Sequence, residues 1–204
     1  MNKRLVGVLL AVCATVAVLA IVVVTVFGNL AQCVDPQYAF YNDSSRYSEL
    51  LGNGGTYTEN FLGGSSLFPN ELPQSANVER FAVEYNKPYD ENYLAYVVYT
   101  CNDDDFASEK ARLNSFESST DKEYKIYGLY EFPYEPAFVL ADEGWGISYA
   151  LAIESTKRIV YFSLSFSNYF TDIEYLKKVD KTYLPKGFNA YPNNPRHEQY
   201  KKEN

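Results

Sequence analysis

The longest apolar stretch of the chain comes first. The 24 residues of Leu5–Gly28 carry no charge, and a helix rising about 1.5 Å per residue would make them about 36 Å long. The hydrocarbon core of a bilayer is about 30 Å thick, so this segment predicts a transmembrane helix. Lys3 and Arg4 precede it, and the next basic residue is Arg46. This bias predicts a cytoplasmic N-terminus and an extracytoplasmic remainder.

Two other fates of this segment stay open. A cleaved secretion signal has a shorter apolar region, of about 7–15 residues, followed by small residues at the cleavage site. A lipoprotein signal is the other alternative, because Leu30-Ala31-Gln32-Cys33 resembles a lipobox whose cysteine would be lipidated. The length of the apolar run and Gln32 before the cysteine favour an uncleaved signal anchor.

The stretch after the anchor has no sustained period. Asp43 is expected to cap a short helix that ends at Leu51, where Gly52 follows. Glycine- and serine-rich turns come next, so we expect a juxtamembrane linker with one short helix. The predicted parts of the chain are a cytoplasmic N-terminus (1–4), an anchor (5–28), a linker (29–66), a folded domain (67–188) and a polar tail (189–204).

Beyond residue 67 the hydrophobic pattern has a period of two, as in β-strands. Short polar connections between consecutive strands require antiparallel pairing, which predicts an α+β domain of order ββαββββα with helices on one face. The expected strands are Val78–Tyr85, Asn92–Cys101, Tyr124–Tyr130, Ala137–Ala141, Ile147–Glu154 and Ile159–Ser167, and the expected helices are 103–116 and 172–178.

The same pattern predicts which side chains are buried. The helix 103–116 should bury Phe106, Leu113 and Phe116, with Ala107 or Ala111 allowing close approach to the sheet. The expected core is Phe81, Val83, Val97, Phe106, Leu113, Ile126, Ala150, Ala152 and either Phe162 or Tyr161.

The negative charge of the chain excludes some classes of binding partner. All 26 acidic residues and 16 of the 18 basic ones lie beyond residue 33, which gives the outer part a formal charge of −10. Nucleic acids and anionic lipid surfaces both reward clustered Lys and Arg, so neither is an expected partner. A membrane, through the N-terminal helix, and a protein or envelope polysaccharide are the expected partners.

The sequence lacks the catalytic and ligand-binding motifs of several enzyme classes. The chain has one histidine, His197, in the polar tail, so a Ser-His-Asp triad is not expected. It has no Cys/His cluster for zinc and no phosphate-binding P-loop. Asp103-Asp104-Asp105 fits a helix N-terminus better than a calcium loop. The sequence therefore favours a non-enzymatic protein, with no catalytic residue, metal or cofactor.

One candidate binding surface remains. Asp142 and Glu143 precede the only tryptophan, Trp145, which stands between two glycines at a predicted hairpin turn. Ordinary turn chemistry accounts for both acids, but an indole at a hairpin tip is either partly exposed or packed on a neighbouring loop. Outside the cytoplasm, a disulfide between Cys33 and Cys101 is also possible.

Tyrosine is unusually common, with 20 residues that include Tyr93, Tyr96 and Tyr99 in one predicted strand and Tyr124, Tyr127 and Tyr130 in another. Tyrosines form good cross-strand pairs, and they are also favoured on binding faces. Sheet packing is the simpler interpretation.

The arrangement of Lys3-Arg4, the apolar Leu5–Gly28 and an acidic outer domain resembles that of uncharacterised single-pass exported proteins of Gram-positive bacteria. The resemblance implies a location at the cell membrane with the C-terminal domain outside. Three functions stay open: a non-enzymatic interaction module, a carbohydrate-binding or carbohydrate-active envelope protein using Trp145 and surface carboxylates, and an anchored accessory subunit of a membrane complex.

Overall fold

The structure, a computed structural model, describes residues 38–118, 131–142, 144–167 and 169–203. Gln37–Asn204 form one compact unit. The predicted anchor 5–28, Cys33 and the predicted strand Tyr124–Tyr130 lie outside the described residues. Within the described ranges, no helix has the length and apolar character needed to span a bilayer.

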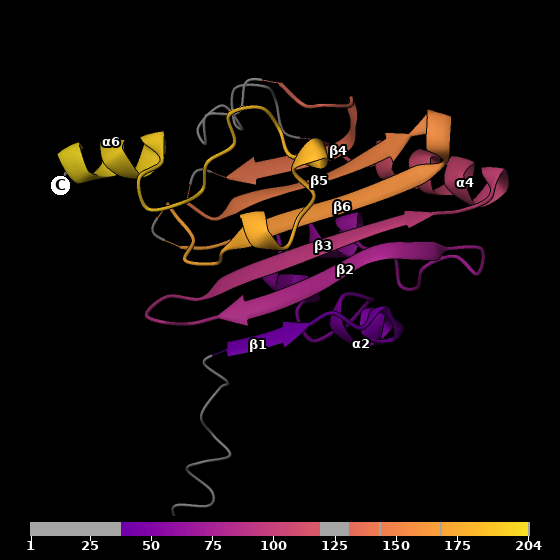
Figure 1. The fold of residues 1–204 in the computed structure, drawn as a ribbon, viewed down its shortest axis with the longest axis horizontal. Helices are drawn as coiled ribbons and strands as arrows, with labels where there is room; N and C mark the ends of the chain where they lie inside the picture. The colour runs from indigo at the N-terminus through magenta and orange to yellow at the C-terminus, as the bar shows by residue number, and fades with distance from the viewer. Residues whose placement is uncertain (1–37, 119–130, 143, 168, 204) are drawn as a thin grey trace, which may run out of the picture. The chain divides into compact units, whose positions relative to one another are not determined.

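A six-stranded, fully antiparallel sheet forms the centre of the domain (Figure 1). Its spatial order is β1-β2-β3-β6-β5-β4, so two three-stranded halves, β1-β2-β3 and β4-β5-β6, meet where β3 pairs with β6. The strands are β1 (Tyr38–Tyr41), β2 (Asn77–Asn86), β3 (Asn92–Thr100), β4 (Pro136–Asp142), β5 (Gly146–Ile153) and β6 (Arg158–Ser165). The predicted antiparallel α+β architecture is confirmed.

Short helices cover one face of the sheet. The predicted core residues Phe81, Val83, Val97, Ala150 and Tyr161 all face this side and are buried. Ala152 is partly buried against them, and Phe162 lies in the core of the other face. The covering elements are η1 (Ser44–Arg46), α2 (Tyr47–Leu50), η2 (Thr58–Asn60), α3 (Gly64–Leu67) and α4 (Asp103–Asn114).

Residues 38–66, which the sequence pattern assigned to a linker, belong to this packed layer. β1 pairs with β2, and Tyr47, Leu50 and Phe61 are buried in the core. Large apolar residues separated by glycine and serine turns have no helical or strand period, although each one buries a full side chain. The short helix expected in this stretch is present as η1 and α2.

Helix α4 differs in detail from its prediction. Its N-cap is Asn102, whose side chain accepts the Asp105 N–H at 2.8 Å, while the three aspartates occupy the first turn. Phe106 and Leu113 are buried as expected, whereas Phe116 lies beyond the helix end and is exposed. Between the two buried residues the inward position is taken by Glu109 rather than by an alanine.

The opposite face is covered by the C-terminal segment, which crosses in front of the sheet in Figure 1. The helix predicted at 172–178 is wrong. Ile173 and Tyr175 are both buried, a spacing of two that suits extended backbone rather than a helix. The Thr171 hydroxyl also accepts the Ile173 N–H at 3.1 Å. Only η5 (Tyr175–Lys177) and η6 (Lys181–Tyr183) are helical here, both as single 3-10 turns, and a third, η4 (Glu154–Thr156), joins β5 to β6.

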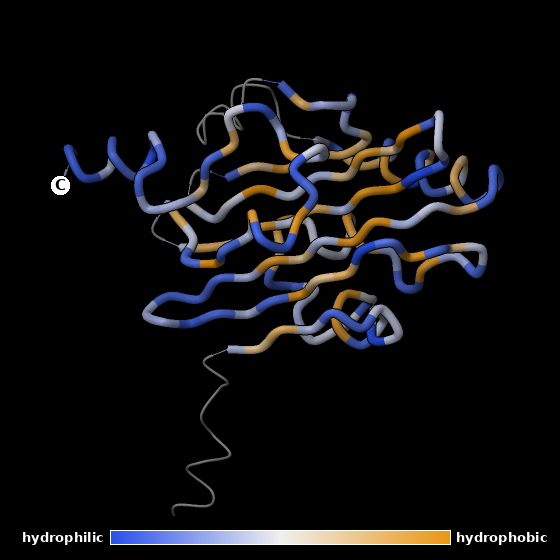
Figure 2. The backbone as a smooth tube through the Cα atoms, viewed as in Figure 1, coloured by the Kyte–Doolittle hydropathy of each residue, from blue (hydrophilic) through white to orange (hydrophobic). Residues whose placement is uncertain are grey.

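The polar end of the chain forms helix α6 (Pro195–Glu203), blue along its length in Figure 2. Asn194 is fully buried and accepts the N–H groups of Arg196 at 2.9 Å and His197 at 3.0 Å. The His197 ring stacks on Phe170, with 4.5 Å between centroids. The predicted polar tail 189–204 therefore includes a capped surface helix.

A candidate ligand pocket at one end of the sheet

The strand register brings several chain segments to one end of the sheet. Tyr93 and Gly146 both lie opposite Ser165, the last residue of β6. Between these strand ends, the β2–β3 turn and the η2 segment is a pocket of about 590 Å³, within the range of about 300–1,000 Å³ typical of small-molecule sites. It is lined by Glu59, Asn60, Phe61, Leu62, Lys87, Tyr89, Asp90, Glu91, Tyr93, Trp145, Ser165, Phe166 and Ser167.

Trp145 has a fixed backbone and a free side chain. The Asp142 carboxylate accepts the N–H groups of Gly144 at 2.8 Å and of Trp145 at 3.1 Å, an Asx-type turn. The Trp145 carbonyl accepts the Phe166 N–H at 3.0 Å, which ties the turn to the end of β6. The indole itself is 63% exposed. The indole forms an aromatic wall of the pocket, and hydrogen bonds hold the backbone that carries it in place.

Gly146 makes this arrangement possible. Its φ is +117°, a conformation that side chains rarely adopt, and a Cβ there would lie 2.0 Å from the Leu164 carbonyl oxygen. Of the two glycines beside Trp145, Gly146 is therefore the one whose positive φ the turn requires. Gly144 does not have a positive φ.

Gly146 also leaves Ser165 without a side-chain partner on β5. Two residues further along β5, Ser148 lies opposite Ser163 of β6, and their hydroxyls hydrogen-bond at 2.5 Å. Ser165 lies opposite Gly146, which has no side chain that could form a hydrogen bond with it. Ser165 is only 6% exposed, and its hydroxyl has no hydrogen-bond partner among the described residues. Ser165, a residue of the pocket lining, thus holds a buried hydroxyl with unmet bonding capacity.

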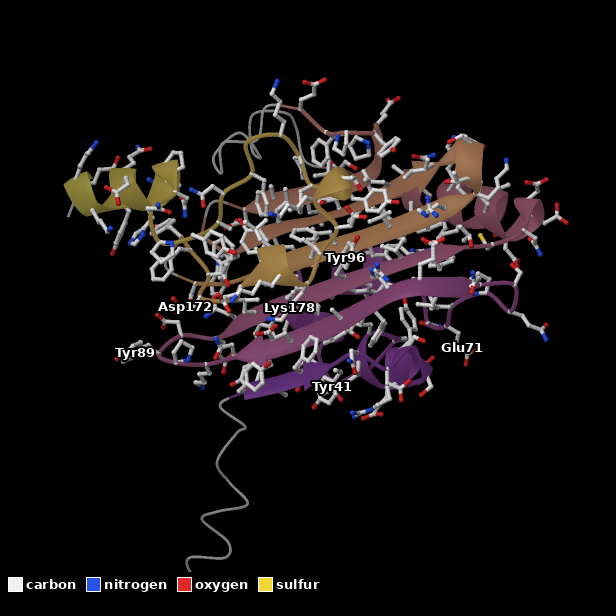
Figure 3. All side chains as sticks on the ribbon, viewed as in Figure 1. Tyr41, Glu71, Tyr89, Tyr96, Asp172 and Lys178 are labelled. Carbon is white, nitrogen blue, oxygen red and sulfur yellow. The ribbon has the colours of Figure 1, made fainter. Side chains whose placement is uncertain are left out.

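The β2–β3 turn supplies a charged rim. The Lys87 ammonium pairs with the Glu91 carboxylate at 2.9 Å, and the Tyr93 hydroxyl donates to the same carboxylate at 2.9 Å. Both hydrogen bonds, that of Lys87 foremost, lower the pKa of Glu91 below its usual value. Burial, followed by the bond to Glu91, raises the pKa of Tyr93. Tyr89 is 91% exposed at the tip of this hairpin (Figure 3).

The inner wall of the pocket is apolar and buried. Phe61, from the helical layer, packs edge-on against Tyr93 with centroids 6.1 Å apart, and Phe166 is buried beside the end of β6. Tyr93, Tyr96 and Tyr99 are all buried in the sheet, so packing accounts for these tyrosines. Tyr124, Tyr127 and Tyr130 lie outside the described residues.

The predicted site residues have different positions. Trp145 lines the pocket, whereas Asp142 is engaged in the turn and does not line it. Glu143 lies outside the described residues. The sequence analysis missed the contributions of η2 and the β2–β3 turn, because it treated the first as linker and the second as a simple connection. The aromatic and acidic run Tyr89-Asp90-Glu91 was the available signal.

Cys101 is a free, partly buried thiol whose pKa is raised by burial. Its proposed partner Cys33 lies outside the described residues, so the disulfide stays a prediction.

A second polar cluster is buried under α4. Glu109 accepts the Tyr161 hydroxyl at 2.5 Å and the Arg112 guanidinium at 2.6 Å and 2.8 Å. Arg112 also donates to the carbonyls of Ser66 and Leu67. Every charged group of this cluster is matched, so its role is to fasten α3 to α4 and the sheet.

Within the described ranges, no group of three or more His, Cys, Asp and Glu side chains is placed to hold a metal ion. No protein-family model, curated protein or solved structure matches the chain.

Proposed function

We propose that this protein is a membrane-tethered, extracytoplasmic binding module without catalytic activity, and that its ligand site is the Trp145 pocket. The observation that carries the proposal is the exposed indole on a backbone fixed from both sides, at the rim of a pocket with an aromatic inner wall. Tryptophan is enriched at binding interfaces, where its ring adds a large apolar contact area and its N–H can donate a hydrogen bond.

The state of the Glu91 carboxylate supports binding rather than catalysis. A general acid needs a carboxyl group whose pKa is raised toward neutrality, and paired acids facing each other are the usual arrangement. The pKa of Glu91 is lowered, and its carboxylate is committed to Lys87 and Tyr93. This group stays ionised and serves to hold the hairpin.

Because the chain has one tryptophan, a single label reports on this site. Full-length protein containing 5-fluorotryptophan, in zwitterionic detergent micelles without a sugar head group, gives one ¹⁹F resonance. A library of small aromatic, amide and polyol fragments is expected to shift this resonance saturably. Failure of the whole library to move it would contradict the proposed site.

The tether is proposed from the length of 5–28 and its basic flank. Mass spectrometry of protein purified from membranes is expected to find these residues retained. A mature N-terminus at Cys33 carrying lipid, or cleavage after residue 28 without lipid, would contradict the anchor.

A further inference from the structure

We infer that the ligand of the Trp145 pocket is a saccharide without negative charge, with one pyranose ring stacked on the indole. This inference rests on the proposed binding function and specifies its ligand class. Three features of the pocket support it: the aromatic face, the mixture of hydrogen-bonding groups and the local charge.

The indole provides the stacking surface. The axial C–H bonds of a pyranose ring form an apolar face, which packs on a flat aromatic ring while the hydroxyls point outward. Trp145 offers such a face at 63% exposure, and Tyr89, at the tip of the β2–β3 hairpin, is another exposed ring lining the same pocket. Because the turn fixes the Trp145 backbone, the backbone loses little entropy on binding.

The polar groups match the hydroxyls of a sugar. Each hydroxyl both donates and accepts, so its site needs donors and acceptors together. Asn60 and Ser167 supply both, and Glu59 supplies acceptor oxygens. The Ser165 hydroxyl is buried in the pocket wall without a partner, which is costly unless a ligand completes its hydrogen bond.

The negative charge of the pocket lining disfavours anionic saccharides. The lining contains three carboxylates, of Glu59, Asp90 and Glu91, against the one ammonium of Lys87, a formal charge of −2. Lys87 is already paired with Glu91. A uronic acid or phosphorylated sugar would place like charges together in the pocket, and this repulsion weakens binding. Neutral and amino sugars avoid this repulsion.

The test uses the same ¹⁹F-labelled full-length protein. The probes are neutral tetramers of glucose, mannose, galactose and N-acetylglucosamine, the cationic tetramer of glucosamine and the anionic tetramer of galacturonic acid. We expect at least one neutral or cationic tetramer to shift the resonance, and the anionic tetramer to bind at least about tenfold more weakly than the best of them.

Variants separate ligand contact from structure. By calorimetry, Trp145→Ala should weaken the best tetramer at least about tenfold, whereas Tyr134→Ala, an exposed aromatic outside the pocket lining, should not. Ser165→Ala should weaken binding about threefold to tenfold without lowering the melting temperature, since it removes a hydroxyl that has no partner in the fold.

The outcomes distinguish this inference from the proposed function. If aromatic or amide fragments bind and no tetramer does, the saccharide inference is overturned and the binding pocket stands. If neither fragments nor tetramers bind, both fail. Preferred binding of the galacturonic acid tetramer, or full retention of affinity in Trp145→Ala, would also overturn the inference.

Discussion

At the scale of single residues, Gly146 controls both the shape and the chemistry of the pocket. Its missing side chain lets β5 begin against the Leu164 carbonyl, and it leaves Ser165 opposite an empty position. The same absence thus positions Trp145 and frees a buried hydroxyl for a ligand.

Gly146→Ala is expected to destabilise the fold by about 2–4 kcal/mol, because the new Cβ meets the Leu164 carbonyl and the φ of +117° is strained for alanine. Gly144→Ala is the matched control. Its nearest atom would be the Asp142 carboxylate oxygen at 3.6 Å, so its effect should stay within about 0.5 kcal/mol. Urea denaturation measures both, and equal effects would contradict the described turn.

Glu91 makes the hairpin rim sensitive to acid. Its pKa is lowered in the folded state, so its stabilising contribution is present above the ordinary carboxyl pKa of about 4.3 and is lost as pH falls through the folded value. Glu91→Gln should therefore lower the melting temperature at pH 7, and the difference from wild type should shrink near pH 2. Glu71→Gln, at an exposed carboxylate of the β1–β2 connection, is the control. A difference independent of pH would rule out this origin.

The sequence alone predicted some of the residues of the site. A tryptophan between glycines indicated a turn with an exposed or loop-packed ring, and the ring is exposed. The pairing of Gly146 with Ser165 depends on the register of β5 and β6, and that of Tyr93 with Ser165 on two strands far apart in sequence. No local pattern carries this information.

At the scale of elements, the C-terminal segment closes one face of the sheet without regular structure of its own. It is held by isolated anchors, among them Ile173 and Tyr175 in the core and Lys178 paired with Glu84 of β2. Figure 3 shows Lys178 lying over β2 and β3. Anchors at irregular spacing carry no period, so the sequence pattern did not identify 172–178 as mainly extended chain.

The Lys178–Glu84 ion pair should matter to this docking. The Glu84 side chain is 4% exposed and that of Lys178 is 21% exposed, so Lys178→Met leaves a buried carboxylate unpaired and should cost about 3 kcal/mol. Adding Glu84→Gln to that variant should recover most of the loss. Lys177→Met breaks an exposed pair with Glu174 and should cost less than about 0.5 kcal/mol. Chemical denaturation decides, and a silent Lys178→Met would contradict the docking.

At the scale of the whole molecule, the domain is a sheet between two unlike layers, short helices on one face and an irregular C-terminal segment on the other. Alternating hydrophobicity sufficed to predict β2 through β6 and their antiparallel pairing. It did not place β1 or the packing of residues 38–66 on the sheet, since four residues of β1 and single buried aromatics such as Phe61 are too short or too scattered to form a pattern.

This difference has a direct consequence for truncation. A chain starting at residue 37 should unfold cooperatively, whereas one starting at residue 67 should not. The shorter chain loses β1 and the buried side chains of Tyr47, Leu50 and Phe61. Losing large core side chains costs about 2–5 kcal/mol each, and their sum approaches the whole stability of a domain. Thermal unfolding by circular dichroism compares the two chains; equal transitions would restore the boundary at 67.

The central claim is that Trp145 is an open wall of a ligand pocket. Its most direct test is the fluorescence of this single tryptophan in the full-length protein, excited where the 20 tyrosines absorb little. The account predicts red-shifted emission that acrylamide quenches readily, because the indole is 63% exposed. Blue-shifted emission resistant to acrylamide would place the indole in the core and contradict both the pocket and the function proposed for it.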